Sequence, residues 1–226
     1  MRAPLKEPFR IFIGYDPRQP IAFQVLAHSI WSRASLPVSI TRLQLDQLPL
    51  MRKGLTEFTY SRYLVPYLCG YEGEAVFLDA DMLCLADIAD LYWICHNRLD
   101  SVSVVKNKLR FEWPSMMFFN NAHCKNLTLD VIEKGQPQAM EWAHSVGEIP
   151  AEWNVLVGYD EPSEDAKIVH YTQGLPCFEE TQDSPYAAEW QEELKSANST
   201  VSWKSIMGQS VHAKPVMERL ARKVAA

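Results

Sequence analysis

Two aspartates, Asp79 and Asp81, directly follow the apolar run Ala75-Val76-Phe77-Leu78, and this feature constrains the fold more than any other. An uninterrupted apolar run is typical of a parallel strand that is covered on both faces. In open α/β sheets, ligands bind outside the carboxyl ends of such strands, where both aspartates fall. Residues i and i+2 of an extended segment project to the same side, so the two carboxylates can converge on one hard cation, such as a divalent metal. The structural alternative is a turn or capping role, which we expect for Asp87 and Asp90 at a short helix.

The composition predicts one large α/β domain. A chain of 226 residues with 47% hydrophobic content can bury a full core. We expect a catalytic domain over residues 1–180 and a helical C-terminal extension of the same domain over residues 181–226. The net charge of −6 and the lack of a Lys/Arg block argue against a nucleic-acid partner. No feature of the sequence indicates an oligomeric state.

The cysteines and the N-terminal residues indicate a cytoplasmic protein without a transmembrane segment. Five cysteines are scattered, odd in number and never at CxxC spacing, which is typical of reduced thiols. The first residues carry no apolar leader-like stretch, and no run reaches the length of a membrane span. An amphipathic basic helix is expected from Lys214 to Val224. Packing on the domain is its simpler interpretation, and peripheral binding at the inner membrane face is the alternative.

Strand and helix patterns alternate along the chain, which predicts a mostly parallel sheet. The expected strands are 10–14, 38–43, 75–78, 101–105, 116–119 and 166–169. The expected helices are 20–31, 59–68, 184–197 and 214–224, and the stretch 127–153 is expected to be helical and irregular. Pro20 suits the first turn of its helix, and Ser184-Pro185 is expected to cap another.

Four motifs occur in an order and spacing that resemble a known family. They are Ile11-Phe12-Ile13-Gly14-Tyr15-Asp16, the stretch Thr59-Tyr60-Ser61-Arg62-Tyr63-Leu64-Val65-Pro66-Tyr67-Leu68, then Phe77-Leu78-Asp79-Ala80-Asp81-Met82-Leu83, and Ile168-Val169-His170-Tyr171-Thr172-Gln173-Gly174. Together with a weaker likeness at Ile149-Pro150-Ala151-Glu152-Trp153-Asn154, they cover roughly the first 180 residues. The chain resembles retaining glycosyltransferases with a GT-A fold, in particular glycosyltransferase family 8 and its bacterial relatives.

The resemblance implies a metal site made of Asp79, Asp81 and His170. In the family, the corresponding residues hold Mn²⁺, which binds the diphosphate of a UDP-sugar, and Mg²⁺ is the alternative ion. A mixed set of carboxylates and an imidazole suits Mn²⁺, which tolerates both oxygen and nitrogen ligands. A lone histidine at a strand end is more often a hydrogen-bonded structural residue, but the two aspartates favour the metal role here.

The resemblance also implies a nucleotide-sugar site. Gly14, Tyr15 and Asp16 would seat the uracil, because a tyrosine ring can cover a base and a carboxylate can accept the uracil N–H. Arg62 would meet the diphosphate or orient an aspartate, and it is counted with Asp79, Asp81 and Asn154 among the catalytic residues. Ala80 and Gly174 complete the implied nucleotide-sugar contacts. The structural alternatives are a simple turn at Asp16-Pro17 and a surface helix charge at Arg62.

Three segments depart from the family pattern. The segment Lys106–Trp113 is short, and Ala143-His144-Ser145-Val146 stands where relatives usually carry an acidic pair or Asp-Gln. Leu175-Pro176-Cys177 follows the last motif in place of a lysine, or of a glycine with a tryptophan. The metal and nucleotide half therefore matches the family better than the sugar and acceptor half.

The resemblance therefore implies a metal-dependent enzyme that transfers a hexose from a UDP-sugar to a glycan or lipid-linked glycan acceptor, with retention. One alternative is a nucleotidyltransferase, which usually has a glycine-rich basic loop after the first strand, unlike Tyr15-Asp16-Pro17-Arg18. The other is a degenerate GT-A domain that binds a nucleotide or a partner without turnover.

Overall fold

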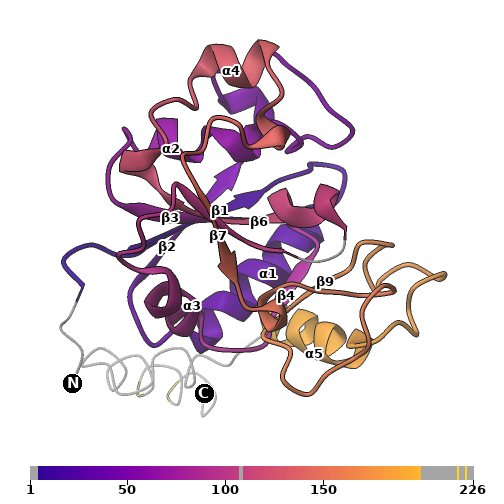
Figure 1. Cartoon of the computed structure of the whole chain (residues 1–226). Coiled ribbons are helices and arrows are strands. Elements are labelled where there is room, and N and C mark those ends of the chain that lie inside the picture. Colours follow the sequence, from indigo (N-terminus) through magenta and orange to yellow (C-terminus); the bar gives the residue numbers. More distant parts are fainter. Residues whose placement is uncertain (1–4, 107–108, 200–217, 219–221, 223–226) are drawn as a thin grey trace.

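A computed structural model describes residues 5–106, 109–199, 218 and 222. Its centre is a six-stranded, mostly parallel sheet flanked by helices (Figure 1). In spatial order the strands are β2 (Val38–Leu43), β1 (Phe9–Gly14), β3 (Glu74–Leu78), β6 (Met116–Asn120), β5 (Val102–Val105) and β7 (Val146–Ile149). A smaller sheet consists of β4 (Met82–Cys84), β9 (Ile168–His170) and β8 (Val155–Leu156). The predicted α/β class is confirmed.

Helices cover both faces of the central sheet, as the apolar runs predicted. Figure 1 shows α1 (Pro20–Arg33) and α3 (Ile88–Cys95) on one face, and α2 (Val65–Leu68) and α4 (Leu129–Lys134) on the other. The protein has a hydrophobic core on each face of the central sheet, and successive residues of β3 pack into one or the other. Val76 and Leu78 pack with α1, whereas Phe77 packs with the residues around α2. From Ala75 to Leu78 the strand is buried on both sides and carries only apolar side chains, and the next polar side chain is Asp79.

The first βαβ unit forms as predicted. β1 pairs in parallel with β2 and β3, so Phe12 lies opposite Phe77 in register. Pro20 occupies the first turn of α1, where its missing N–H costs nothing. The expected stripe of Ala22, Leu26 and Ile30 is buried.

The expected helix 59–68 is broken into two short pieces. A 3₁₀ segment, Ser61–Leu64, leads into α2, and Pro66 lies in the first turn of α2. A proline is tolerated there but not in a helix interior, which explains the break. Gly70 and Gly73 end the segment with positive φ angles of 63° each, a conformation that favours glycine. Asp87 caps α3 by accepting a hydrogen bond from the Ala89 N–H, as predicted.

One expectation about the second half of the sheet is wrong, and it concerns β7. β6 runs antiparallel to both β3 and β5, whereas the other pairs of this sheet are parallel, so the sheet is mostly parallel as predicted. β7 is a strand within the stretch 127–153 that was expected to be helical, and it pairs in parallel with β5 at the sheet edge. An edge strand needs few apolar residues, and only Ile149 of β7 is buried, so the sequence pattern was too weak to reveal it.

The helix expected from Ser184 begins later than predicted. It is α5 (Ala187–Ala197), and it is preceded by Tyr186 in a left-handed conformation, with φ of 60°. Ser184 makes no capping hydrogen bond to it. The expected helix from Lys214 to Val224, with its membrane hypothesis, lies outside the described residues apart from positions 218 and 222. The division of the chain at residue 180 stays a prediction.

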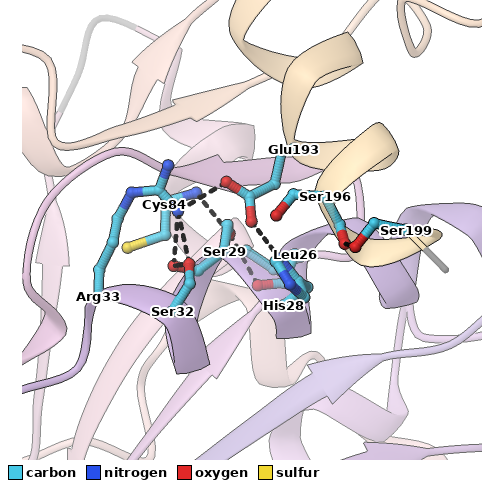
Figure 2. A network of polar contacts seen from close by, with 9 residues as sticks. All are labelled: Leu26, His28, Ser29, Ser32, Arg33, Cys84, Glu193, Ser196 and Ser199. Carbon is cyan, nitrogen blue, oxygen red and sulfur yellow. Dashed lines mark hydrogen bonds and ion pairs between the residues drawn. The ribbon is translucent and has the colours of Figure 1, made fainter. Parts of the chain in front are cut away.

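Helix α5 is held against α1 by a buried carboxylate. Figure 2 shows Glu193 of α5 between His28 and Arg33 of α1, and Glu193 accepts from both side chains, with 2.7 Å to Arg33. On the same helix, the Ser29 hydroxyl accepts the Cys84 N–H of β4 at 3.1 Å. One face of α1 therefore connects α5 to the strand that follows Asp81.

All five cysteines are free, as expected, and three of them are buried. No helix in the described part of the chain is long and apolar enough to cross a membrane.

We predict that Glu193→Gln lowers the free energy of unfolding by about 1–3 kcal/mol. The substitution leaves Arg33 and His28 without their buried anion, and both are about one-third exposed, which limits the loss. Glu192→Gln removes the same charge one residue earlier from a side chain that is 77% exposed. This control is expected to stay within about 0.5 kcal/mol of wild type in urea unfolding. Equal effects of the two substitutions would contradict the structural role of Glu193.

Candidate functional site: a carboxylate and histidine cluster at the carboxyl end of β3

The structure brings Asp79, Asp81 and His170 together at the carboxyl end of β3. One ligand atom from each of the three lies within 4.8 Å of the others. The pairing of β4 with β9 causes this convergence, because Met82 lies opposite His170 and the Tyr171 N–H donates to the Asp81 carbonyl at 2.9 Å. Asp81 Oδ1 lies 3.3 Å from His170 Nε2. The arrangement suits a single divalent cation.

The buried oxygens of this cluster fit a cation. Asp79 Oδ1 and Asp81 Oδ1 are buried and make no hydrogen bond within the described residues, and each meets a positive group only through an ion pair. Buried charged groups are normally paired, hydrogen-bonded or bound to a metal. A divalent ion would satisfy both oxygens at once.

The pKa values follow from burial and from the close charges. Burial raises the pKa of Asp79 to about 7, although the Arg62 guanidinium opposes the shift. Burial acts in the same direction on Asp81, but His170 outweighs it and holds the pKa of that carboxyl below its usual range. For His170, burial lowers the pKa, and Asp81 together with the other nearby carboxylates reverses this, so the net shift is upward. In the metal-free protein, the Asp81 and His170 side chains therefore form an ion pair.

Arg62 lies beside the cluster rather than on the surface. Its guanidinium is 3.1 Å from Asp79 Oδ1, and its Nε donates to the Phe58 carbonyl at 3.1 Å. The guanidinium carbon lies 5.6 Å from the centroid of the Phe58 ring and 5.2 Å from that of the Phe77 ring. The Arg62 side chain is only 12% exposed, so it is not the surface charge of the structural alternative, and its anion in this structure is Asp79.

A cavity of about 330 Å³ opens beside Asp81. It is lined by Asp16, Ala80 and Gly174 of the predicted nucleotide-sugar residues, together with Arg18, Gln19, Thr56, Phe58, Thr172, Gln173 and Phe178 among others. Gly174 has φ of 127°, where a side chain would be strained. A larger cavity of about 920 Å³ lies near the start of β1 and β3, around Tyr92 and His96, far from the aspartates in the sheet. The smaller cavity is therefore the one associated with the carboxylate cluster.

Tyr15 and Gly14 lie next to this cavity but do not line it. The guanidinium carbon of Arg42 lies 4.5 Å from the centroid of the Tyr15 ring, and the Phe23 ring is nearly perpendicular to the Tyr15 ring, with 5.8 Å between their centroids. A Cβ at position 14 would come within 2.5 Å of the Phe58 ring, so glycine is needed there for packing.

Asp16 has a partner that the sequence did not predict. Its carboxylate accepts from the Arg18 guanidinium at 2.6 and 2.9 Å, and these hydrogen bonds lower the pKa of Asp16. The Gln19 N–H also donates to the Asp16 carbonyl at 3.0 Å, so the turn expected at Asp16-Pro17 is present as well. Arg18 itself is mostly exposed.

Asn154 connects to the cluster through a residue that the sequence did not single out. Its Nδ2 donates to the Ser115 hydroxyl at 2.9 Å, and the Ser115 carbonyl accepts the Asp79 N–H at 2.9 Å. Glu112 was also missed, and its Oε2 is 3.8 Å from His170 Nδ1. Neither residue belongs to a motif, and only the antiparallel pairing of β6 with β3 brings their segment to the site.

A curated protein is similar to this chain in sequence. No family model matches the chain. Protein CDI of Arabidopsis thaliana is 38% identical over 231 residues, which cover 85% of this chain and 88% of that protein. The chain belongs to the family of Protein CDI.

Similar solved structures are glycosyltransferases. The bifunctional glycosyltransferase WbbM matches with a TM-score of 0.67 at 14% identity over 92% of this chain. GlyE of Streptococcus pneumoniae matches with a TM-score of 0.60 at 15% identity over 89% of this chain. The galactosyltransferase LgtC, solved with donor and acceptor sugar analogues, gives 0.56 at 10% identity over 87% of this chain and 99% of its own.

The chain spans 52% of the WbbM chain and 62% of the GlyE chain. At these identities the likeness shows the fold, and the GT-A glycosyltransferase fold is confirmed. The member of the Protein CDI family described here thus carries its candidate divalent-metal site on a glycosyltransferase fold.

We predict that Asp79→Asn stabilises the metal-free protein at pH 8. A carboxyl whose pKa is raised in the folded state favours folding only while it is protonated, so its contribution is lost as the pH rises from about 4 to 7. A shift from 3.8 to about 7 corresponds to roughly 4 kcal/mol, which is an upper limit for the gain.

Urea unfolding with a chelator, at pH 5 and pH 8, tests this prediction. The difference between Asp79→Asn and wild type should grow with pH, whereas the exposed control Asp46→Asn should show no trend. A pH-independent loss of about 1 kcal/mol would instead indicate a capping aspartate.

Proposed function

We propose that this protein is a metal-dependent glycosyltransferase that moves a hexose from a UDP-sugar to a glycan or lipid-linked glycan acceptor. The observation that carries the proposal is the cluster of Asp79, Asp81 and His170 at the carboxyl edge of a GT-A sheet. Membership of glycosyltransferase family 8, retention of the anomeric configuration and the choice of Mn²⁺ over Mg²⁺ rest on the motif resemblance. A cytoplasmic location with peripheral membrane contact belongs to the same proposal.

The residues of the cluster would hold the ion, and the ion would neutralise the diphosphate leaving group. Breaking the bond between the sugar and UDP leaves negative charge on the diphosphate while the sugar becomes oxocarbenium-like. Arg62 keeps Asp79 in place through the 3.1 Å contact and adds a second positive charge near the same point. Asn154 supports this side of the site through Ser115, whose carbonyl holds the Asp79 backbone.

The cavity beside Asp81 would take the nucleotide. Ala80 and Gly174 line it with little bulk, and Asp16 offers a carboxylate to the uracil N–H. The Arg18 side chain of the ion pair is 70% exposed, and pairs with an exposed partner contribute only about 0–1 kcal/mol. A hydrogen bond to a charged acceptor contributes about 1.5–3 kcal/mol, so a base can compete for Asp16. Tyr15 and Gly14 would shape the wall behind the base.

A donor screen tests the proposed reaction. The protein is incubated with UDP-glucose or UDP-galactose and Mn²⁺, and release of UDP is measured. Slow UDP release supports a transferase, and pyrophosphate chemistry would indicate a nucleotidyltransferase. Binding of the nucleotide without turnover would indicate a degenerate domain, an outcome suggested by the absence of an acidic pair at 143–146.

The same assay on ligand variants tests the metal site. Asp79→Asn, Asp81→Asn and His170→Ala should each lower the rate by about a hundredfold or more, because each removes one ligand of a single ion. The Asp79/Asp81 double variant should be hardly worse than either single variant, because the ion is already lost. Additive effects together with an unchanged Mn²⁺ response would contradict the proposal.

We predict that Asp16→Ala weakens UDP binding about ten- to a hundredfold without unfolding the protein, since one hydrogen bond to a charged acceptor is lost. Calorimetric titration of UDP in the presence of Mn²⁺ measures the change. Arg18→Ala removes the competing ion pair and should leave UDP affinity equal or higher. An unaltered affinity of Asp16→Ala would return Asp16 to its turn role.

A further inference from the structure

The two ring nitrogens of His170 have different surroundings. Nε2 faces Asp81 at 3.3 Å, on the side of the candidate metal site. Nδ1 is buried and has no hydrogen bond to any residue that the structure describes. An unpaired buried polar atom costs free energy, so a group that pairs with Nδ1 has a physical role. Glu112 is the carboxylate on that side, with Oε2 at 3.8 Å.

Glu112 is fixed relative to the metal ligands by its own segment. It belongs to the 3₁₀ segment Arg110–Ser115, which leads directly into β6. The Ser115 hydroxyl donates to the Glu112 carbonyl at 2.6 Å, and the Ser115 carbonyl accepts the Asp79 N–H at 2.9 Å. The backbone that carries Glu112 is thus tied to the backbone of a metal ligand through one residue. Its side chain is 16% exposed, so the carboxylate lies at the border of the site rather than in solvent.

We propose that Glu112 is a positioning residue for the metal site, whose carboxylate accepts the Nδ1–H of His170 when the ion is bound. The proposal rests on the proposed function, because it assumes that His170 binds a divalent cation. A metal-binding imidazole donates its second N–H to a carboxylate or carbonyl, which fixes the tautomer and the ring orientation. The present 3.8 Å between Nδ1 and Oε2 exceeds the usual hydrogen-bond length by slightly less than 1 Å, so the proposal requires the Glu112 carboxylate to approach the ring by about that much when the ion binds.

The arrangement gives the Glu112 carboxylate a role at the site through the ring of His170. With Nδ1 protonated and held by Glu112, the Nε2 lone pair is directed at Asp81 and the cation. Without an acceptor, the ring could turn or take the other tautomer, and its affinity for the ion would fall. Glu112 therefore acts through His170 and does not itself need to touch the ion.

The test is a titration with Mn²⁺ alone, followed by the electron paramagnetic resonance signal of the free ion. The protein is compared with Glu112→Ala, Glu112→Gln and the control Glu161→Ala, which removes an exposed glutamate between β8 and β9. Thermal unfolding in the presence of a chelator verifies that each variant is folded. Glu112→Ala should weaken Mn²⁺ binding about ten- to a hundredfold. Glu112→Gln should restore most of the affinity, because its amide oxygen can still accept the Nδ1–H.

Each outcome decides between the roles. Mn²⁺ binding by Glu112→Ala that equals that of wild type and Glu161→Ala would overturn the positioning role. A loss in Glu112→Gln as large as in Glu112→Ala would also overturn it, because the charge or direct ligation would then matter rather than the hydrogen bond. If wild type itself binds no Mn²⁺, the metal-dependent function fails together with this inference. Normal binding by wild type with unaffected variants removes this inference alone.

Discussion

The buried carboxylate of Asp79 is the constraint on which the rest of the site depends. It lies at the end of a strand that is apolar on both faces, so water cannot hydrate it and its pKa rises to about 7. A charge in that position requires compensation, and the structure offers it in two forms: the Arg62 guanidinium at 3.1 Å and a place for a cation shared with Asp81 and His170. The elements around Asp79 hold Arg62, Asp81 and His170 close to its carboxylate.

Three chain segments that are distant in sequence meet at Asp79. The 3₁₀ segment 61–64 supplies Arg62, the antiparallel β6 brings the Ser115 carbonyl to the Asp79 N–H, and the pairing of β4 with β9 sets His170 beside Asp81. Helix α1 stabilises β4 from behind through Ser29, and α5 is fixed to the same helix by Glu193 (Figure 2). The pairing of β4 with β9, which sets His170 beside Asp81, is therefore stabilised by helix α1.

The sequence predicted the features of the fold that are determined by residues close to one another in the chain. The apolar run before Asp79, Pro20 at the start of α1 and the cap at Asp87 each express a short-range preference, and the structure confirms all three. The direction of β6 and the existence of β7 depend on strand pairing, which leaves little trace in a single sequence. Glu112 and the Arg18 partner of Asp16 were missed for a related reason. A single charged residue outside a motif forms no recognisable sequence pattern. Its role depends on residues that are distant in the sequence and that only the fold brings close to it.

The charge state of His170 links the metal-free fold to metal binding. In the metal-free protein the raised pKa of His170 allows its protonated ring to balance Asp81, so a positive group already stands among the carboxylates. A divalent cation would replace the proton on Nε2 rather than enter an uncompensated cluster of negative charge, and its binding would release protons. The carboxylates can then stay in nearly the same positions, because the sign of the charge between them does not change. The ion pair between Asp81 and His170 thus allows the buried carboxylates to be compensated in the metal-free protein and still to be available to a metal ion.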